Sequence, residues 1–276
     1  SVLAGKLAGA RVLLMLHDTV STPLFRGLFA ALSPMCDGYI VVSRRTKETY
    51  FSGINSRWAR KPVFEIPAPV DTTRFNAEDV DPSIGVLNEC GISITTLGSV
   101  NPDKGLEYFI EMARLLKSRH PSISFNIVGP IYKSQAVYAK RLSKIVKNSG
   151  LLSLKFIGAS DNVPAILKST DIYVCSSLSE ASPMSVWEAM AMELAVVSTN
   201  VGDVARYISD GKEGFVVPVA DANALADKVG LLINSEALRS KFGQKARSVV
   251  LSELDIGVCV SKHRAVYHAI GGVTSF

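Results

Sequence analysis

The sequence has few cysteines, and none of them stands in a ligand-binding spacing. Its four cysteines are scattered over 276 residues and form no CxxC pair and no Cys/His cluster. This usage is typical of reduced thiols in a cytosolic protein rather than of a disulfide framework or a zinc site. We therefore expect no bound metal at Cys36, Cys90, Cys175 or Cys259.

Long hydrophobic runs are also absent. Hydrophobic residues make up 47% of the chain, but no uninterrupted apolar run reaches the roughly eighteen residues of a membrane-spanning helix. The first residues of the sequence lack the pattern of a secretory signal, in which basic residues are followed by an apolar run and small residues. These features predict a soluble, cytoplasmic, globular chain with one large or two medium domains.

Charge is not concentrated either. The net charge of +5 is modest, and its even spread gives no nucleic-acid footprint. One local concentration surrounds Trp58, where Arg57, Arg60 and Lys61 stand in SRWARKP. This segment fits contact with an anionic membrane surface, and hence a peripheral location at the inner membrane face. It fits equally a solvated loop with one anchored aromatic ring.

The first part of the chain alternates between strand and helix patterns. Short apolar, β-branched runs of this kind suit strands of a parallel sheet that are buried on both faces. The pattern predicts strands at residues 11–18, 38–43 and 62–67, with helices at residues 25–32 and 46–52. Pro67, Pro69 and the polar residues after them predict a linker.

From about residue 84 the alternation restarts and is more regular. Strand patterns in ISITTLGS, ISFNIVG, LKFIG, DIYVCSS, AVVST and EGFVV are separated by amphipathic helix patterns. This spacing predicts a doubly wound α/β domain with a parallel sheet, whose ligands bind beyond the carboxyl ends of the strands.

The segment SEASPMSVWEAMA follows the strand DIYVCSS and contains a helix start. We expect Ser182 to cap the helix and Pro183 to be its first residue, since that position tolerates a missing N–H. The amides of Met184 and Ser185 would then be free. Free amides at the positive end of a helix dipole form an anion site, most commonly for phosphate.

Two glutamates flank this predicted anion site. Glu180 lies in the loop before the helix, where it can accept hydrogen bonds from sugar hydroxyls, and Glu188 lies two turns into the helix, where it can reach a ribose. One loop and one helix would thus hold both halves of a sugar nucleotide. The alternative is a loop acid favoured by the helix dipole together with an ordinary helical glutamate.

These residues resemble the E-x7-E block of the retaining glycosyltransferases of family four, also described as glycosyl transferases group 1, which have the GT-B fold. The similarity continues through GSVNPDKGLEYFIEMARLL, FIGASDNVPAILKSTDIYVCSS, AVVST, NVG and DGKEGFVVP. IPAPVDTTRF resembles the family's linker, and LLMLHD and DGYIVVS resemble the second half of its amino-terminal domain. The resemblance runs from about residue 12 to about residue 270.

The resemblance implies two Rossmann-like, doubly wound parallel-sheet domains, the first of them incomplete. The expected boundaries are a partial acceptor-side domain at 1–70, a linker at 71–83, a donor domain at 84–250 and a helix at 251–276 that returns to the first domain. The first strand and glycine-rich loop of such a domain are not in the sequence. We therefore expect self-association or a second chain to complete it.

The implied function is transfer of a sugar from a UDP-sugar or GDP-sugar to an unknown saccharide, lipid or other acceptor. The anomeric configuration would be retained, and neither a metal nor another cofactor would take part. Two alternatives stay open: a non-catalytic sugar-nucleotide-binding subunit, and a sugar-nucleotide epimerase of the same fold, since fold alone does not fix chemistry.

The resemblance also implies roles for single residues. Lys104 would contact the diphosphate, Glu180 the donor sugar and Glu188 the ribose, while Gly98 and Gly129 would let the backbone approach the nucleotide. The plainer interpretations are a solvated lysine and ordinary turn glycines.

His17, at a strand end, would lie near the donor sugar or be a satisfied strand-end histidine. Ser99 stands where the family usually has an arginine, so we expect a weaker diphosphate clamp or an altered donor. Ala68 and Pro69 replace a usual Asn-Gly in the linker and stiffen it.

Overall fold

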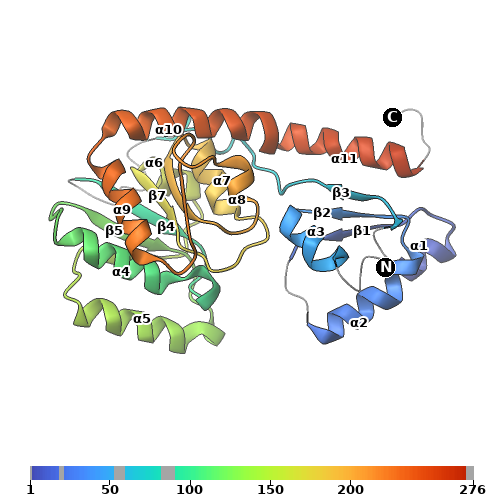
Figure 1. Ribbon diagram of the computed structural model, residues 1–276, viewed down its shortest axis with the longest axis horizontal. Helices are drawn as coiled ribbons and strands as arrows, with labels where there is room; N and C mark the ends of the chain where they lie inside the picture. The colour runs from blue at the N-terminus through green and yellow to red at the C-terminus, as the bar shows by residue number, and fades with distance from the viewer. Residues whose placement is uncertain (1, 19–21, 53–59, 82–90, 272–276) are drawn as a thin grey trace.

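The structure, a computed structural model, describes residues 2–18, 22–52, 60–81 and 91–271. Its two sheets lie side by side along the long axis (Figure 1). The first sheet has three parallel strands in the order β1-β2-β3. These are β1 (Leu13–Leu16), β2 (Gly38–Val41) and β3 (Val63–Glu65). The small sheet fits the expected incomplete first domain, and each strand is shorter than the sequence pattern suggested.

Helices cover both faces of the first sheet. Phe29 of α2 (Pro23–Leu32) and Tyr50 of α3 (Arg44–Phe51) pack on Tyr39 of β2 in one cluster. On the opposite face, α11 (Ile256–Gly271) contributes Cys259 and Val266. A short helix, α1 (Val2–Leu7), precedes β1. The first sheet is therefore buried by a helix that comes from the far end of the chain.

The second sheet has six parallel strands in the order β6-β5-β4-β7-β8-β9. The order reverses direction at β4, which is the doubly wound topology that the sequence predicts. The strands are β4 (Ser93–Leu97), β5 (Ser124–Val128), β6 (Leu154–Gly158), β7 (Ile172–Cys175), β8 (Ala195–Thr199) and β9 (Phe215–Val217).

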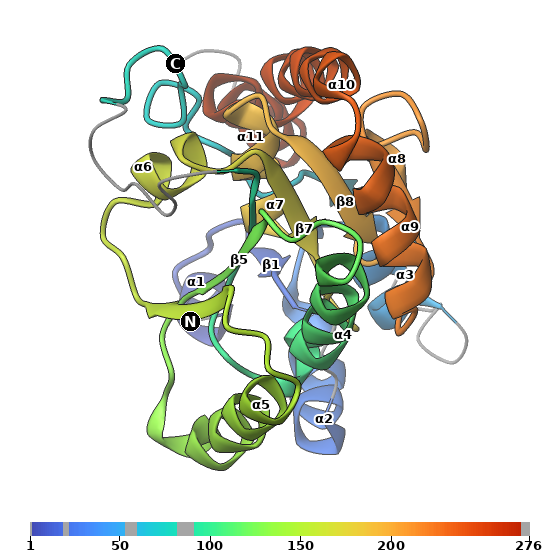
Figure 2. The same ribbon diagram turned by 90° about the vertical axis from the view of Figure 1, so that its left-hand side faces the viewer.

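Two hydrophobic clusters hold helices against the two faces of this sheet (Figure 2). One face packs against α4 (Leu106–Lys117), α5 (Ala136–Asn148) and α9 (Ala222–Ile233). The other face packs against α6 (Val163–Lys168), α7 (Met184–Ala191), α8 (Val204–Tyr207) and the end of α10 (Glu236–Val249). The fully buried Trp187 of α7 packs edge-on against Tyr207 of α8.

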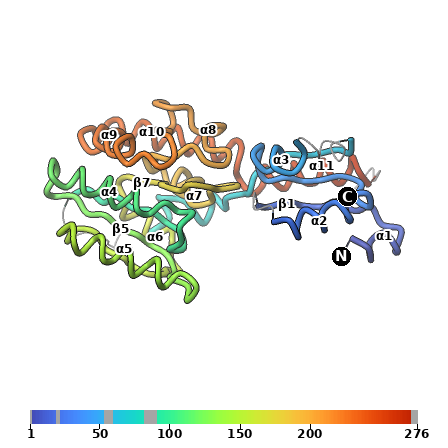
Figure 3. The backbone as a smooth tube through the Cα atoms, turned by 60° about the horizontal axis from the view of Figure 1, so that its bottom comes forward, coloured from blue at the N-terminus to red at the C-terminus, as the bar shows by residue number. Residues whose placement is uncertain are grey.

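The chain passes between the two sheets twice, and the two passages run alongside each other (Figure 3). The Val70 N–H donates to the Leu254 carbonyl over 2.8 Å, and the Ile256 N–H donates to the Val70 carbonyl over 3.0 Å. The Thr72 hydroxyl also donates to the Asp255 carboxylate over 2.6 Å. A π-helical turn at Val250–Leu254 joins α10 to α11 at this point. These two passages form the connection between the domains.

The predicted basic segment is only partly described. Arg57 and Trp58 lie outside the described residues, so the membrane contact stays a prediction. The Lys61 ammonium donates to the carbonyls of Ser33 and Pro34, over 3.1 and 2.7 Å, and closes the turn after α2. Within the described ranges, no helix is long and apolar enough to span a bilayer. The described cysteines are buried free thiols.

The exposed leucines on α2 can be substituted to test the predicted self-association. Leu24 and Leu28 are 85% and 55% exposed, and such apolar surface favours association with another chain. We expect Leu24→Gln combined with Leu28→Gln to weaken self-association at least fivefold, measured by sedimentation velocity across a dilution series. Leu152→Gln, at a 92% exposed leucine in the second domain, is the control. A monomer at every concentration would contradict this prediction.

Candidate nucleotide-sugar site

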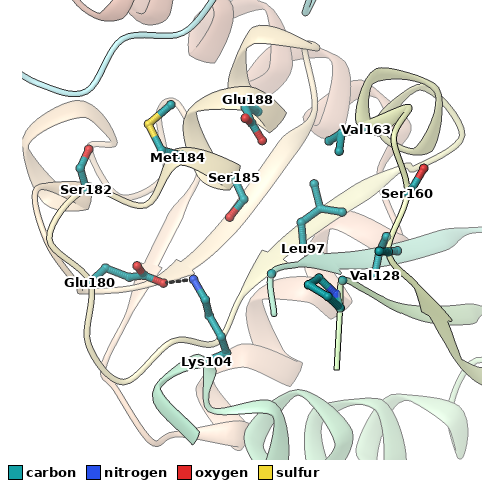
Figure 4. Close-up of a pocket in the computed structure, with 14 residues that line it drawn as sticks. Leu97, Lys104, Val128, Ser160, Val163, Glu180, Ser182, Met184, Ser185 and Glu188 are labelled. Atoms are coloured by element: carbon teal, nitrogen blue, oxygen red, sulfur yellow. Dashed lines mark hydrogen bonds and ion pairs between the residues drawn. The ribbon is translucent and has the colours of Figure 1, made fainter. Parts of the chain in front are cut away.

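A pocket of about 460 Å³ lies at the carboxyl ends of β4, β5 and β7, where a doubly wound sheet binds its ligands. One part of its wall is polar and the other is apolar (Figure 4). The polar part is formed by Lys104, Glu180, Ser182, Ser185 and Glu188, and the rest by Leu97, Gly98, Val128, Gly129, Pro130, Ala159, Ser160, Val163 and Met184.

An ion pair joins two of the predicted site residues. The Lys104 ammonium lies 2.6 Å from Oε1 of Glu180, and the two side chains point toward one another (Figure 4). The same carboxylate oxygen accepts a 2.8 Å hydrogen bond from the buried Ser177 hydroxyl. Both charged side chains are largely shielded, at 24% and 15% exposure. The pair therefore fixes a cation and an anion at one end of the pocket.

Two interlocked loops hold this ion pair. The turn Pro102–Lys104 is followed by Gly105, whose φ of +56° places its backbone against the Ser176 carbonyl; a Cβ there would lie 2.2 Å from that oxygen. In return, the Ser176 hydroxyl donates to the Lys104 carbonyl over 2.9 Å, and the Leu178 N–H donates to the Asp103 carbonyl over 2.7 Å. Lys104 and the loop that carries Glu180 therefore form one unit.

Gly98 and Gly129 end neighbouring strands and touch each other. Both have φ near +150°, and a Cβ on Gly129 would lie 2.0 Å from the Gly98 carbonyl oxygen. A Cβ on Gly98 would crowd the Lys104 side chain, at 3.0 Å from Cε. Both glycines are thus required by the packing of the pocket wall.

The start of α7 differs from the expected cap. Pro183 occupies the N-cap position with ψ 83°, and no side chain caps the helix. The Ser182 hydroxyl instead accepts a 3.0 Å hydrogen bond from the Trp187 indole. The prediction for Ser182 as the cap was wrong because the buried indole needs an acceptor and takes this hydroxyl. Met184 and Ser185 are the first two helical residues, whose amides have no partner within the helix.

Glu188 lines the same pocket as Glu180, and the pKa of its carboxyl is shifted. Burial raises the pKa of its carboxyl from 4.5 to about 7, against a small opposing effect of Arg74. Tyr173, beneath α7, is fully buried, and this burial holds the pKa of its hydroxyl well above the usual range. Neither feature was foreseen, because burial of these side chains depends on the packing of α6, α7 and β7.

Two predicted residues lie outside this pocket. His17 is exposed just after β1, but its neighbour Asp18 lines a smaller cavity between the domains, about 260 Å³, together with Lys104 and Glu180. Ser99 is half-buried, and its hydroxyl accepts a 2.9 Å hydrogen bond from the Asn101 amide. The roles expected for both stay predictions.

Among the described residues, no group of His, Cys, Asp or Glu could hold a metal ion.

A three-stranded parallel sheet beside a doubly wound six-stranded sheet, with a pocket at the carboxyl ends of the larger one, fits the GT-B class of fold. The chain belongs to the glycosyl transferases group 1 family, whose model matches residues 81–249. The family expected from the sequence is therefore confirmed.

Similar proteins include the putative glycosyltransferase EpsD of Bacillus subtilis, 28% identical over 207 residues, which cover 75% of this chain and 50% of EpsD. The capsular polysaccharide biosynthesis glycosyltransferase CapM of Staphylococcus aureus is 23% identical over 172 residues, covering 62% of this chain and 44% of CapM. The chain thus spans about half or less of the length of the curated relatives it matches.

Solved structures show the same fold. A glycosyltransferase from Rickettsia africae superposes with a TM-score of 0.83 at 20% identity, covering 98% of this chain and 73% of that one. HepE of Anabaena, solved in complex with UDP and glucose, superposes with a TM-score of 0.81 at 17% identity. The superposition covers 99% of this chain and 74% of HepE. At these identities the likeness establishes the GT-B fold.

The raised pKa of Glu188 predicts a pH-dependent stability. The carboxyl ionises at lower pH in the unfolded chain than in the folded one, so its burial lowers the free energy of unfolding as pH rises from 4.5 to about 7. The stability gained by Glu188→Gln should therefore grow by about 2 to 3 kcal/mol between pH 5 and pH 8. Urea unfolding of both proteins at the two pH values measures it. Glu78→Gln, at an exposed site, should show no such growth, and a constant difference for Glu188→Gln would disprove the burial effect.

Proposed function

We propose that this chain binds a nucleotide-diphosphate sugar in the pocket at the end of the second sheet and serves its transfer to an acceptor hydroxyl. The observation that carries this proposal is the Lys104–Glu180 ion pair, which places a cation and a carboxylate at one end of a pocket. The donors of structurally similar proteins, such as the UDP-glucose bound to HepE, support a UDP-sugar, with a GDP-sugar as the alternative. Acceptor and sugar stay open.

The pocket suggests a place for each part of the donor. The apolar wall of Leu97, Val128 and Val163 suits the flat base. Glu188, beside this wall, suits the ribose hydroxyls, and the first amides of α7 with Lys104 suit the diphosphate. Glu180 then accepts hydrogen bonds from hydroxyls of the donor sugar. Gly98 and Gly129 let the protein backbone approach the nucleotide closely.

The chemistry asked of these residues is charge stabilisation. When the bond between the sugar's anomeric carbon and the β-phosphate oxygen breaks, the electron pair leaves with the nucleoside diphosphate. The acceptor oxygen bonds to the anomeric carbon, and its proton passes to the leaving phosphate. Lys104 and the α7 amides would stabilise the growing negative charge, a task that other enzymes give to a divalent ion. We propose retention of configuration and independence of metal as part of this function.

Lys104 gives a direct test of donor binding. Lys104→Ala should weaken UDP or GDP binding at least tenfold. Among the described residues that line the pocket, Lys104 is the one with a cationic side chain, and it would pair with the diphosphate. Isothermal titration calorimetry at two salt concentrations measures this loss, which should shrink as salt rises. Lys155→Ala, at an exposed lysine of β6, is the control. Unchanged affinity in Lys104→Ala would rule out this diphosphate site.

Glu180 separates binding from transfer. Glu180→Gln removes the negative charge that pairs with the Lys104 ammonium. Bare UDP should therefore bind as well as in the wild type or a few-fold more tightly. Turnover should fall at least a hundredfold, because the loss is of a contact to the reacting sugar. Equal losses in both quantities would contradict the assignment.

Donor binding without transfer in the wild type would favour the non-catalytic subunit, and a new sugar nucleotide formed without acceptor would favour the epimerase.

A further inference from the structure

A buried carboxylate of the second domain contacts the first domain. Asp203, directly before α8, is 6% exposed, and its two carboxylate oxygens lie 3.0 and 3.1 Å from the main-chain nitrogen of Arg44. Arg44 is the first residue of α3, which already has its own cap in Ser43. Asp203 therefore adds a second acceptor, from the other domain, to the positive end of this helix.

Weaker ion pairs surround this contact. Glu65, at the end of β3, pairs with Lys47 of α3 over 2.7 Å and with Arg206 of α8 over 3.2 Å. Arg206 also lies 3.8 Å from Asp203. These cationic side chains are 43% and 46% exposed, and pairs of that kind contribute little. The buried hydrogen bond of Asp203 is the contact that fixes geometry.

Asp203 lies on the same turn that supports the Glu180 loop. Its neighbour Gly202 has φ +53°, and a Cβ there would lie 2.7 Å from the Ala181 carbonyl oxygen. At the start of this turn, the buried Thr199 hydroxyl donates to the Ser177 carbonyl over 2.7 Å. One rigid turn therefore joins α3 of the first domain to the loop that carries Glu180.

The first domain faces that loop again at the end of β1. Asp18 lines the cavity between the domains together with Lys104, Ser179 and Glu180. The two passages at Val70 and Leu254–Ile256 connect the domains at one place, and Asp203 contacts the first domain at another, on α3. A change in the angle between the domains would change the distance between Asp18 and Glu180.

We propose that Asp203 is a positioning residue, which holds the two domains at one angle by accepting the Arg44 N–H and so keeps the end of β1 against the Glu180 loop. The inference rests on the proposed function, because this distance matters only if Glu180 contacts the donor sugar. Burial raises the pKa of Asp203 in spite of the Arg44 hydrogen bond. The contact itself needs an oxygen acceptor, which the side-chain amide of Asn also supplies, so Asp203→Asn should preserve it.

The test measures the angle directly. Spin labels at Ala31→Cys and Leu152→Cys, two exposed sites in different domains, report the interdomain distance by double electron–electron resonance. Cys90→Ser removes the cysteine that lies outside the described residues, and the others are buried. Asp203→Ala should broaden or shift the distance distribution, whereas Asp203→Asn should match the wild type. Asp227→Ala, at an exposed aspartate of α9, is the control.

A second pair of variants removes the donor and leaves the second domain untouched. Arg44→Pro deletes the N–H at a helix position that tolerates proline, and Arg44→Ala keeps it. Only Arg44→Pro should reproduce the effect of Asp203→Ala. An unchanged distribution in both Asp203→Ala and Arg44→Pro overturns the proposal, as does an Asp203→Asn distribution as broad as that of Asp203→Ala.

Nucleotide binding separates this proposal from the proposed function. Asp203→Ala should bind UDP within twofold of the wild type, since the pocket lies within the second domain. Loss of binding in Asp203→Ala alone would show that Asp203 supports the pocket rather than the angle and would overturn the inference. If the wild type itself bound neither UDP nor GDP, the proposed function would fail, while the label distances would still decide the role of Asp203 in the angle.

Discussion

The approach of Gly105 to the Ser176 carbonyl is the constraint on which the site depends. No other residue type fits there, because a side chain would overlap the oxygen. With this approach the turn that carries Lys104 lies directly on the loop after β7, and hydrogen bonds in both directions hold the two segments together. The 2.6 Å ion pair between Lys104 and Glu180 is a consequence of that packing. A parallel sheet supplies the setting, since β4 and β7 are neighbours whose carboxyl ends meet at one edge.

The sequence predicts much of this architecture because parallel strands leave a strong pattern. Apolar runs separated by amphipathic helices gave the doubly wound sheet and the approximate place of every strand. Strand ends were less accurate: residues 11–18 were predicted, and Leu13–Leu16 form β1. Hydrogen-bond partners decide where a strand ends, and they come from β2, whose position a local pattern does not encode.

The site was predictable in its membership but not in its internal contacts. The spacing of Glu180 and Glu188 and the resemblance around Lys104 indicated residues that do line one pocket. The pairing of Lys104 with Glu180, across 76 positions of sequence, was not foreseen. Nor was the pKa of about 7 for Glu188. Both depend on tertiary distances and burial, which helix periodicity and capping rules do not contain. Ser182 failed as a cap for the same reason, since a buried indole from the next turn competes for its hydroxyl.

The ion pair also explains how the proposed anion site can keep its cation in place. A lysine alone beside Gly98 would have no fixed position, and ordering it when a diphosphate arrives would cost side-chain entropy. Glu180 holds the ammonium near the place where the proposed diphosphate lies, and Ser177 holds the carboxylate in turn. If the proposed diphosphate took the ammonium, the carboxylate would be released next to the sugar hydroxyls, which could then donate to it. One exchange of partners would thus prepare both the leaving group and the sugar, with neither side chain leaving the pocket wall.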